Sequence, residues 1–280
     1  MVGLWLLTAM CALHLAGALT NFAGVPCGRS LASRRTGKIV GGLAANPGEF
    51  PWIVSLKRHG GHFCGGTIIH EQWIVTAAHC LCNGPSPLSA SQINVTLKEH
   101  DLSRPSISTV PVLRIMFHPS HSCSSFNNDI ALLELTRSIQ WSDLIRPACL
   151  PSGSLDYSEQ SVTVAGWGWT NENPSQGRRS NILQKVALSV VSNQVCQAWY
   201  QSEGKKINVK ESQMCAGHEQ GGKDACWADS GGPLMLLGAE STQVIGLVST
   251  GIGCARPRLP GLYTRLTRYI GWISDTLDIH

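Results

Sequence analysis

Three residues of this 280-residue chain could together perform nucleophilic chemistry: His79 in "VTAAHC", Asp129 in "NNDIALLEL" and Ser230 in "DSGGPL". A serine hydroxyl is a weak nucleophile near neutral pH, so it needs an adjacent base to take its proton. A histidine can serve as that base when an acid fixes its tautomer and stabilises its charged form. Each residue alone has a non-catalytic explanation, as a surface histidine, a turn aspartate or a loop serine. Their order and their contexts together favour a catalytic set.

Short apolar runs, typical of β-strands, must position these residues. They cover residues 50–56, 65–78, 110–118, 129–135, 161–169 and 242–250. Turn-forming stretches such as "NPGE", "RHGG" and "CNGP" separate them, which indicates an all-β sandwich or barrel. The C-terminal stretch "YTRLTRYIGWISDTL" differs, because Leu266, Tyr269, Ile270, Ile273 and Leu277 recur at helical spacing. This spacing predicts an amphipathic helix that docks on the body of the protein.

The composition is that of a globular protein, with 43% hydrophobic and 14% charged residues. The formal net charge is +4, and no run of Lys and Arg is longer than a pair. Such a weak and scattered positive charge argues against nucleic acid and membrane surfaces as partners.

The first 18 residues form an apolar stretch that ends in the small residues "AGA". This pattern predicts a secretory signal peptide over residues 1–18, cleaved after Ala18. A membrane anchor is the alternative, but the run is short, contains His14 and lacks flanking basic residues. We therefore expect a soluble, secreted, extracellular protein. Residues 19–38, rich in small, polar and basic side chains, read as a flexible leader.

Ten cysteines remain once Cys11 leaves with the signal peptide: Cys27, Cys64, Cys80, Cys82, Cys123, Cys149, Cys196, Cys215, Cys226 and Cys254. An even number in a secreted chain predicts five disulfides. A zinc site is the competing interpretation, and it is weak because no paired CxxC modules occur. We expect no metal and no cofactor. Asn94, in the only N-x-S/T sequon, is a candidate for glycosylation.

Seven short motifs place the chain beside a known family. "KIVGG", "TAAHC", "NDIALL", "AGWG", "MCAG", "DSGGPL" and "PGLYT" occur in this order, and the chain resembles the trypsin/chymotrypsin family of serine endopeptidases over residues 39–280. The resemblance implies two antiparallel six-stranded β-barrels with a C-terminal α-helix and an active site between the barrels. It also implies the roles: Ser230 attacks the scissile carbonyl, His79 shuttles the proton, and Asp129 orients His79.

The resemblance further implies a zymogen, with residues 19–38 as an activation peptide or light chain. Cleavage between Lys38 and Ile39 would free an α-amino group that pairs with Asp229. Because Lys38 precedes the cut, a trypsin-like activating protease is an expected partner, beside protein and peptide substrates. Protein protease inhibitors are further candidate partners, and we expect a monomer.

The family's disulfide pattern maps onto most of the cysteines. The resemblance implies the pairs Cys64–Cys80, Cys196–Cys215, Cys226–Cys254 and Cys27–Cys149, of which the last would keep the leader attached after cleavage. One further family disulfide is missing, since Val162 and Leu236 occupy its positions. Cys82 and Cys123 are left over, and we infer an extra bridge between the loops that flank His79 and Asp129.

Substrate preference also follows from the resemblance. Asp224 lies six residues before Ser230, where trypsin-like members carry an acid at the pocket floor. A buried carboxylate there selects Arg or Lys, because a neutral side chain would leave it unpaired. Ala225 replaces the serine that many trypsins carry, and this favours Arg over Lys. The other residues that the resemblance places around the substrate are Ser249, Thr250, Gly251, Gly261, Trp227 and Phe126.

Ala228 departs from the family pattern. The resemblance implies an oxyanion hole made by the amides of Ala228 and Ser230, and glycine is the usual residue at position 228. Alanine keeps the N–H group but disfavours backbone angles that glycine adopts freely. We expect Ala228 to affect efficiency rather than to abolish activity. A catalytically impaired or non-catalytic homologue, acting as a binding or regulatory module, is the alternative class; the retained His79, Asp129 and Ser230 argue against it.

Overall fold

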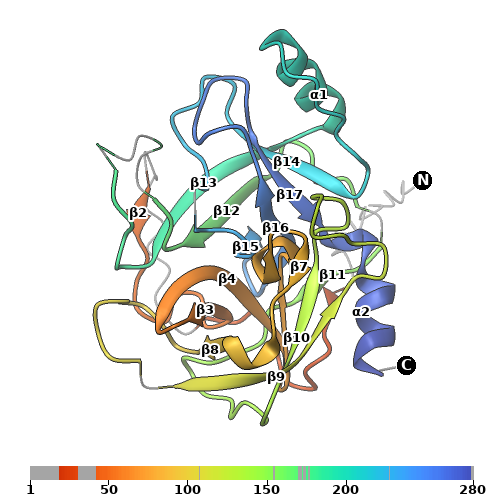
Figure 1. Ribbon diagram of the computed structural model, residues 1–280. Coiled ribbons are helices and arrows are strands. Elements are labelled where there is room, and N and C mark those ends of the chain that lie inside the picture. The colour runs from red at the N-terminus through yellow and green to blue at the C-terminus, as the bar shows by residue number, and fades with distance from the viewer. Residues whose placement is uncertain are drawn as a thin grey trace, which may run out of the picture.

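Two six-stranded antiparallel β-barrels make up most of the protein, as expected from the sequence (Figure 1). The computed structural model describes residues 19–30, 42–106, 108–153, 155–169, 172, 175, 177–226 and 228–278. The predicted signal peptide, Lys38, Ile39 and Trp227 lie outside the described residues. None of the helices in the described ranges combines the length and apolar character needed to cross a bilayer.

The first barrel closes in the strand order β10-β5-β4-β3-β8-β9. Its strands are β3 (Ile53–Arg58), β4 (Gly61–His70), β5 (Trp73–Thr76), β8 (Asn94–Thr96), β9 (Thr109–Phe117) and β10 (Ala131–Leu135). The inward-facing side chains form a close-packed apolar core, in which Trp52, Leu56, Ile68 and Ile74 have no exposed surface. Burial of these large side chains is the main term that stabilises the barrel.

The second barrel closes because β12 pairs with β13 at the two ends of the strand order β12-β15-β16-β17-β14-β13. Its strands are β12 (Ser161–Gly166), β13 (Gln184–Val191), β14 (Gln213–Gly217), β15 (Pro233–Leu237), β16 (Thr242–Thr250) and β17 (Gly261–Arg265). The short strand β2 (Leu43–Ala44) joins its outer side through β13. The pairing of β2 with β13 therefore anchors the residues that follow the expected cleavage junction.

The remaining elements are short. They are β1 (Leu19–Thr20), which pairs with β11 (Leu150–Pro151); β6 (Cys82–Asn83), which pairs with β7 (Ser86–Pro87); the 3₁₀-helices η1 (Ala78–Leu81), η2 (Ala90–Gln92) and η3 (Leu266–Arg268); and the helices α1 (Asn193–Ser202) and α2 (Ile270–Leu277).

The C-terminal helix forms but begins later than its apolar spacing suggests. Tyr263 pairs with Met214 and Val248 inside the barrel, so residues up to Arg265 are strand and only Ile270–Leu277 are α-helical. Barrel closure outweighs local helical periodicity here. The buried side chains Tyr269 and Ile273 pack into the large core cluster that contains the side chains of the first barrel, and Figure 1 shows α2 (blue) at the C-terminal end of the chain.

The leader is less free than its composition suggests. Leu19 and Thr20 pair with β11, and the backbone of Gly28 is bonded to Pro147 and Thr242. The Cys27–Cys149 disulfide ties the same segment to the body. Residues 19–30 are thus packed against the protein, and the prediction of a flexible leader is wrong for them. Residues 31–38 lie outside the described ranges.

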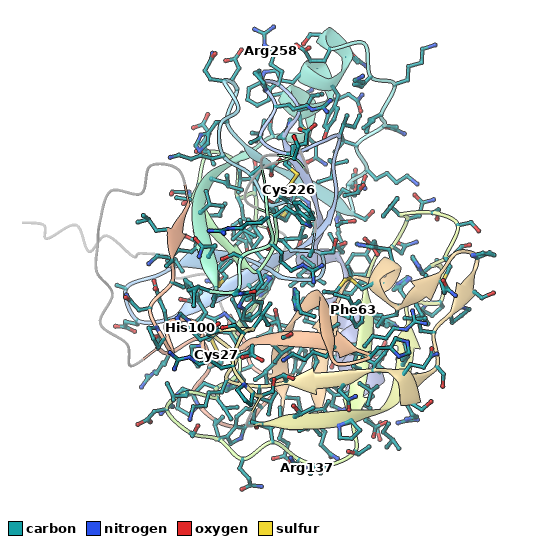
Figure 2. All side chains as sticks on the ribbon, turned by 60° about the vertical axis from the view of Figure 1, so that its left-hand side comes forward. Cys27, Phe63, His100, Arg137, Cys226 and Arg258 are labelled. Carbon is teal, nitrogen blue, oxygen red and sulfur yellow. A yellow bond between two sulfur atoms is a disulfide. The ribbon has the colours of Figure 1, made fainter. Side chains whose placement is uncertain are left out.

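Five disulfides join cysteines of the described chain, in the pairs that the sequence suggested: Cys27–Cys149, Cys64–Cys80, Cys82–Cys123, Cys196–Cys215 and Cys226–Cys254. In Figure 2 disulfides are drawn as yellow bonds, for example the one at Cys226. The apolar Val162 and Leu236, at the positions of the missing family disulfide, lie in or against the core of the second barrel.

Candidate active site

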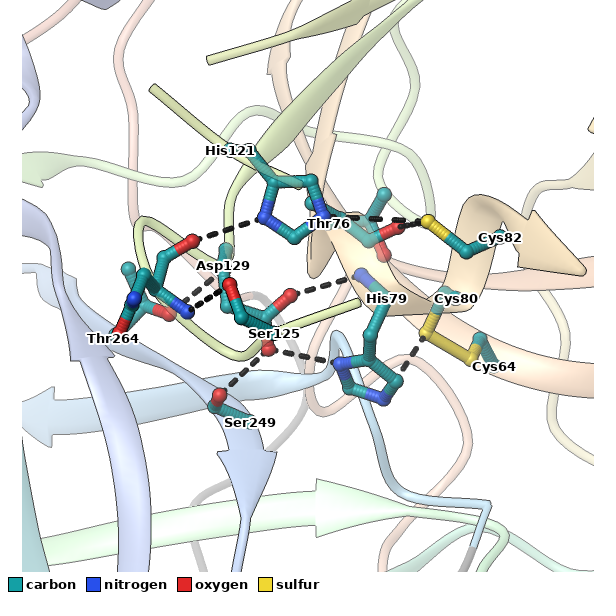
Figure 3. Close-up of polar contacts among 12 residues, drawn as sticks. Cys64, Thr76, His79, Cys80, Cys82, His121, Ser125, Asp129, Ser249 and Thr264 are labelled. Atoms are coloured by element: carbon teal, nitrogen blue, oxygen red, sulfur yellow. Dashed lines mark hydrogen bonds and ion pairs between the residues drawn. A yellow bond between two sulfur atoms is a disulfide. The ribbon is translucent and has the colours of Figure 1, made fainter. Parts of the chain in front are cut away.

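His79 and Asp129 meet at the edge of the first barrel. His79 lies in η1 directly after β5, and Asp129 lies just before β10. The His79 Nδ1 is 2.7 Å from Asp129 Oδ2, and the backbone N–H of His79 donates to Oδ1 at 2.8 Å (Figure 3). Because the carboxylate only accepts hydrogen bonds, the Nδ1 carries the proton and Nε2 presents its lone pair. This is the tautomer that a general base requires.

The second barrel supplies two further bonds to Asp129. Ser249 Oγ, in β16, donates to Oδ2 at 2.5 Å, and Thr264 Oγ1, in β17, donates to the backbone oxygen at 2.7 Å. Asp129 is only 2% exposed, and this burial acts to raise its pKa. The hydrogen bonds and charge of His79, with the bond from Ser249, outweigh the burial and lower the pKa below its ordinary value. Asp129 is therefore ionised at neutral pH.

Ser230 lies between β14 and β15 and reaches the first barrel through its backbone. Gly65 N–H, in β4, donates to Ser230 O at 2.8 Å. The next residue, Gly231, has φ +76°, and a Cβ there would lie 2.2 Å from Thr76 Oγ1 and 2.6 Å from Gly65 O. Only glycine fits that approach, which sets the Ser230 segment beside residues 76 and 77. No hydrogen bond joins Ser230 Oγ to His79 Nε2, although both residues are described; such bonds are often long in unliganded enzymes.

Ala228 adopts φ 74°, the left-handed region that favours glycine. Its carbonyl oxygen is held by His62 Nε2 at 3.1 Å, and Ser55 Oγ bonds His62 Nδ1 at 2.8 Å. Since a carbonyl only accepts, Nε2 carries the ring proton and Nδ1 accepts from Ser55. Burial lowers the pKa of His62 to about 4, so the ring is neutral at physiological pH. His62 and Ser55 thus fix the peptide after Ala228, a function that no sequence motif revealed.

Asp229 and Asp224 line one cavity of about 960 Å³. Asp229 accepts from the N–H groups of Cys226 (2.9 Å) and Gly168 (2.8 Å), yet burial raises its pKa to about 6. Asp224 accepts from Ala225 and Ala255, yet burial raises its pKa to about 7. Backbone donors do not fully offset the loss of solvation at either carboxyl. Both acids would gain from a cationic partner.

The other predicted substrate residues are spread around this cavity and the triad. A Cβ on Gly261 would lie 2.8 Å from Asp224 Oδ1, and one on Gly251 would lie 3.9 Å from Gly261 Cα, so both glycines leave space near Asp224. Phe126 is 47% exposed, and its ring stands edge-on to His79 at 5.3 Å. Ser249 is buried and its hydroxyl is committed to Asp129. Thr250 is half-buried at the end of β16.

Two side-chain groups of the first barrel bear on metal binding, and Asn94 is the predicted glycan position. Lys57 Nζ donates to Glu99 Oε2 at 2.8 Å, so this carboxylate is already paired with an ammonium group. Among described residues, Cys82, Cys123 and His121 have ligand atoms within 4.8 Å of one another, but both sulfurs are in a disulfide. A disulfide sulfur is not the thiolate that zinc binds. Asn94 is half-buried at the start of β8.

Two six-stranded barrels with a histidine–aspartate pair and a nucleophile-bearing loop at their junction define the class of chymotrypsin-like serine proteases. The model of the Trypsin family matches residues 39–273 of this chain. The chain therefore belongs to the trypsin family of serine proteases.

We predict that Ala228→Gly stabilises the protein by about 1 kcal/mol, because a left-handed backbone costs an alanine roughly 1–2 kcal/mol and glycine regains part of this. Urea denaturation of both proteins measures the difference. The same change should alter kcat/KM only modestly, since the alanine amide is present. A gain beyond about 10³, the value of a whole oxyanion donor, would show that the amide is misaimed in the native protein.

Proposed function

We propose that the chain is an active, secreted endopeptidase that cleaves after Arg, and less well after Lys, once it has been cut between Lys38 and Ile39. The observation that carries the proposal is the hydrogen-bonded chain from Ser249 through Asp129 to His79, in the tautomer that a base needs. A protein that only binds a partner does not need a histidine held in the tautomer of a general base. This arrangement therefore makes the non-catalytic homologue the weaker candidate.

The proposed reaction uses His79 as a proton carrier. His79 Nε2 takes the proton of Ser230 Oγ as the oxygen attacks the scissile carbonyl, and the imidazolium then protonates the leaving amine. Ionised Asp129 stabilises the imidazolium, and the amides of Ala228 and Ser230 stabilise the oxyanion. Water repeats the sequence on the acyl-enzyme. No metal or cofactor takes part in these steps.

The activation switch is supported by the cavity around Asp229. Gly42 lines this cavity, and the three residues between the cut and Gly42 can span up to roughly 10 Å. The new Ile39 ammonium can therefore enter and pair with Asp229, because burial raises the pKa of this carboxyl to about 6 and a paired ammonium would stabilise its ionised form. Removing one partner of such a buried pair typically costs about 3–5 kcal/mol, which is enough to govern the active conformation.

The direct test is labelling with a serine-directed phosphonate after cleavage at Lys38. We expect stoichiometric labelling of Ser230 by peptide mass spectrometry and turnover of an arginyl peptide amide. The Ser230→Ala variant, cleaved in the same way, serves as the control and should remain unlabelled. Correctly processed protein that neither reacts nor turns over would instead favour the non-catalytic homologue.

The pocket acid predicts how ligand binding depends on pH. A benzamidinium ion needs the ionised Asp224, whose pKa is raised to about 7 by burial. Binding of benzamidine should therefore weaken about tenfold per pH unit below 7, and about 10²-fold in all between pH 8 and pH 5. Calorimetry across this range measures it. Asp224→Asn should bind weakly at every pH; a wild-type affinity that is flat from pH 5 to 8 contradicts the assignment.

Activation predicts loss of activity at high pH. Pairing with Asp229 raises the pKa of the Ile39 amine above the ordinary value of about 8. Its stabilisation is complete below that ordinary value and is lost as pH rises through the raised value. We expect kcat/KM of the cleaved enzyme to fall between about pH 9 and 11 while circular dichroism shows that the barrels persist. Activity that is undiminished at pH 11 would disprove the switch.

A further inference from the structure

The carboxylate of Glu172 holds a turn between β16 and β17, 82 to 84 residues further along the chain. Its Oε2 accepts from the backbone N–H of Cys254 at 3.0 Å and from Arg256 Nε at 2.8 Å. Its Oε1 accepts from Arg256 Nε at 2.9 Å and also from Nη2. The bonds from Arg256 and Cys254 lower the pKa of Glu172 to about 2, so this carboxyl is ionised throughout the physiological range.

The same turn holds the pocket acid Asp224 from its other side. The N–H of Ala255 donates to Asp224 Oδ2 at 3.1 Å, so two successive amides of the turn serve two different carboxylates. The carbonyl oxygen of Ala255 accepts from the N–H of Gly222 at 2.8 Å. Glu172, Cys254 and Ala255 all line the cavity that contains Asp224. Glu172 is therefore linked to the pocket acid through one short piece of backbone.

This piece of backbone has a conformation that needs support from its surroundings. Ala255 adopts φ 58°, in the left-handed region that is unfavourable for alanine. Gly253 has φ +73°, and a Cβ there would lie 2.5 Å from Glu172 Oε2 and 2.4 Å from Arg256 Nε. The Cys226–Cys254 disulfide fixes the residue before Ala255 only. Glu172 binds the residues on both sides of Ala255, and this arrangement sets the direction of the Ala255 N–H group.

The exposure of the pair decides where its effect should appear. The side chains of Arg256 and Glu172 are 48% and 26% exposed, and ion pairs of this kind add little to the stability of a fold. The two-bond geometry of the guanidinium nevertheless fixes its orientation on the carboxylate. We therefore expect the pair to act on one peptide group of the pocket wall, and so on ligand binding, rather than on unfolding.

We propose that Glu172 is a positioning residue for the substrate pocket. By holding the residues on both sides of Ala255, it aims the Ala255 N–H group at Asp224 and fixes that carboxylate for a cationic side chain. Glu172 acts without touching the substrate, because Arg256 occupies its carboxylate. This proposal rests on the proposed cleavage after Arg and Lys, and it adds a residue that no motif of the sequence marks.

The first test is Glu172→Gln in the cleaved protein. Glutamine cannot accept the guanidinium at both carboxylate oxygens, so the turn is held less firmly. We expect calorimetry at pH 8 to show benzamidine binding weakened by roughly three- to tenfold, the range for a partly exposed, charge-assisted bond. The loss on an arginyl chromogenic amide should fall mainly on KM rather than on kcat. Urea denaturation should give a midpoint close to that of the wild type.

Arg256→Gln separates positioning from a direct effect of charge. If the two charges acted directly on a bound cation, loss of the anionic Glu172 would weaken benzamidine binding and loss of the cationic Arg256 would strengthen it. A positioning role predicts that both variants bind more weakly. It also predicts that the double variant is about as weak as Glu172→Gln alone, because the two side chains act as one unit. Tighter binding by Arg256→Gln overturns the proposal.

Glu134→Gln is the matched control, since Glu134 pairs with the exposed Arg114 on strands of the first barrel. It should leave benzamidine affinity unchanged. Wild-type protein that binds benzamidine while Glu172→Gln binds it equally well overturns the role of Glu172 alone. Correctly cleaved wild type that neither binds benzamidine nor hydrolyses the amide overturns the proposed function, and the role of Glu172 with it. If it binds but does not hydrolyse, the peptidase function fails and the affinities of the variants still decide the role of Glu172.

Discussion

The buried carboxylate of Asp129 is the interaction on which the site depends. It takes two hydrogen bonds from His79 in the first barrel and one from Ser249 in the second, and Thr264 of the second barrel holds its backbone. Burial alone would make an ionised acid costly here; these donors and the charge of His79 lower its pKa instead. One satisfied charge therefore aligns the two barrels and fixes the tautomer of His79.

The two acids of the neighbouring cavity, Asp224 and Asp229, have raised pKa values, whereas that of Asp129 is lowered. Burial raises the pKa of Asp224 to about 7 and that of Asp229 to about 6, and backbone N–H groups are the hydrogen-bond donors that each accepts from. In the proposed cycle a cation completes each one: the Ile39 amine at Asp229 and a substrate guanidinium at Asp224. The protein thus combines a permanent charge that organises the site with two charges that become favourable on activation and on binding.

The fold and most of the candidate site could be predicted from the sequence because the signals for them are local. Strand-like runs, an even set of cysteines and the contexts of His79, Asp129 and Ser230 stand in contiguous letters, and the expected barrels are confirmed. Sequence reasoning did not reach His62, whose bond to Ala228 joins segments far apart in the chain, or Ser55, which bonds His62. Helix α1 was missed too, although Ser192 at its N-cap and Cys196 and Tyr200 at helical spacing could have indicated it. The start of α2 was misplaced because barrel pairing of Tyr263 overrides helical periodicity.

The central claim is that Asp129 acts on catalysis through the tautomer of His79 rather than through the fold. Asp129→Asn keeps the shape of the side chain but can donate to Nδ1, which moves the ring proton to Nε2. Measured on the cleaved enzyme, kcat should fall by about 10⁴, the loss that the equivalent change causes in this family's triad, with benzamidine affinity unchanged. A kcat within about tenfold of the wild type would contradict the account.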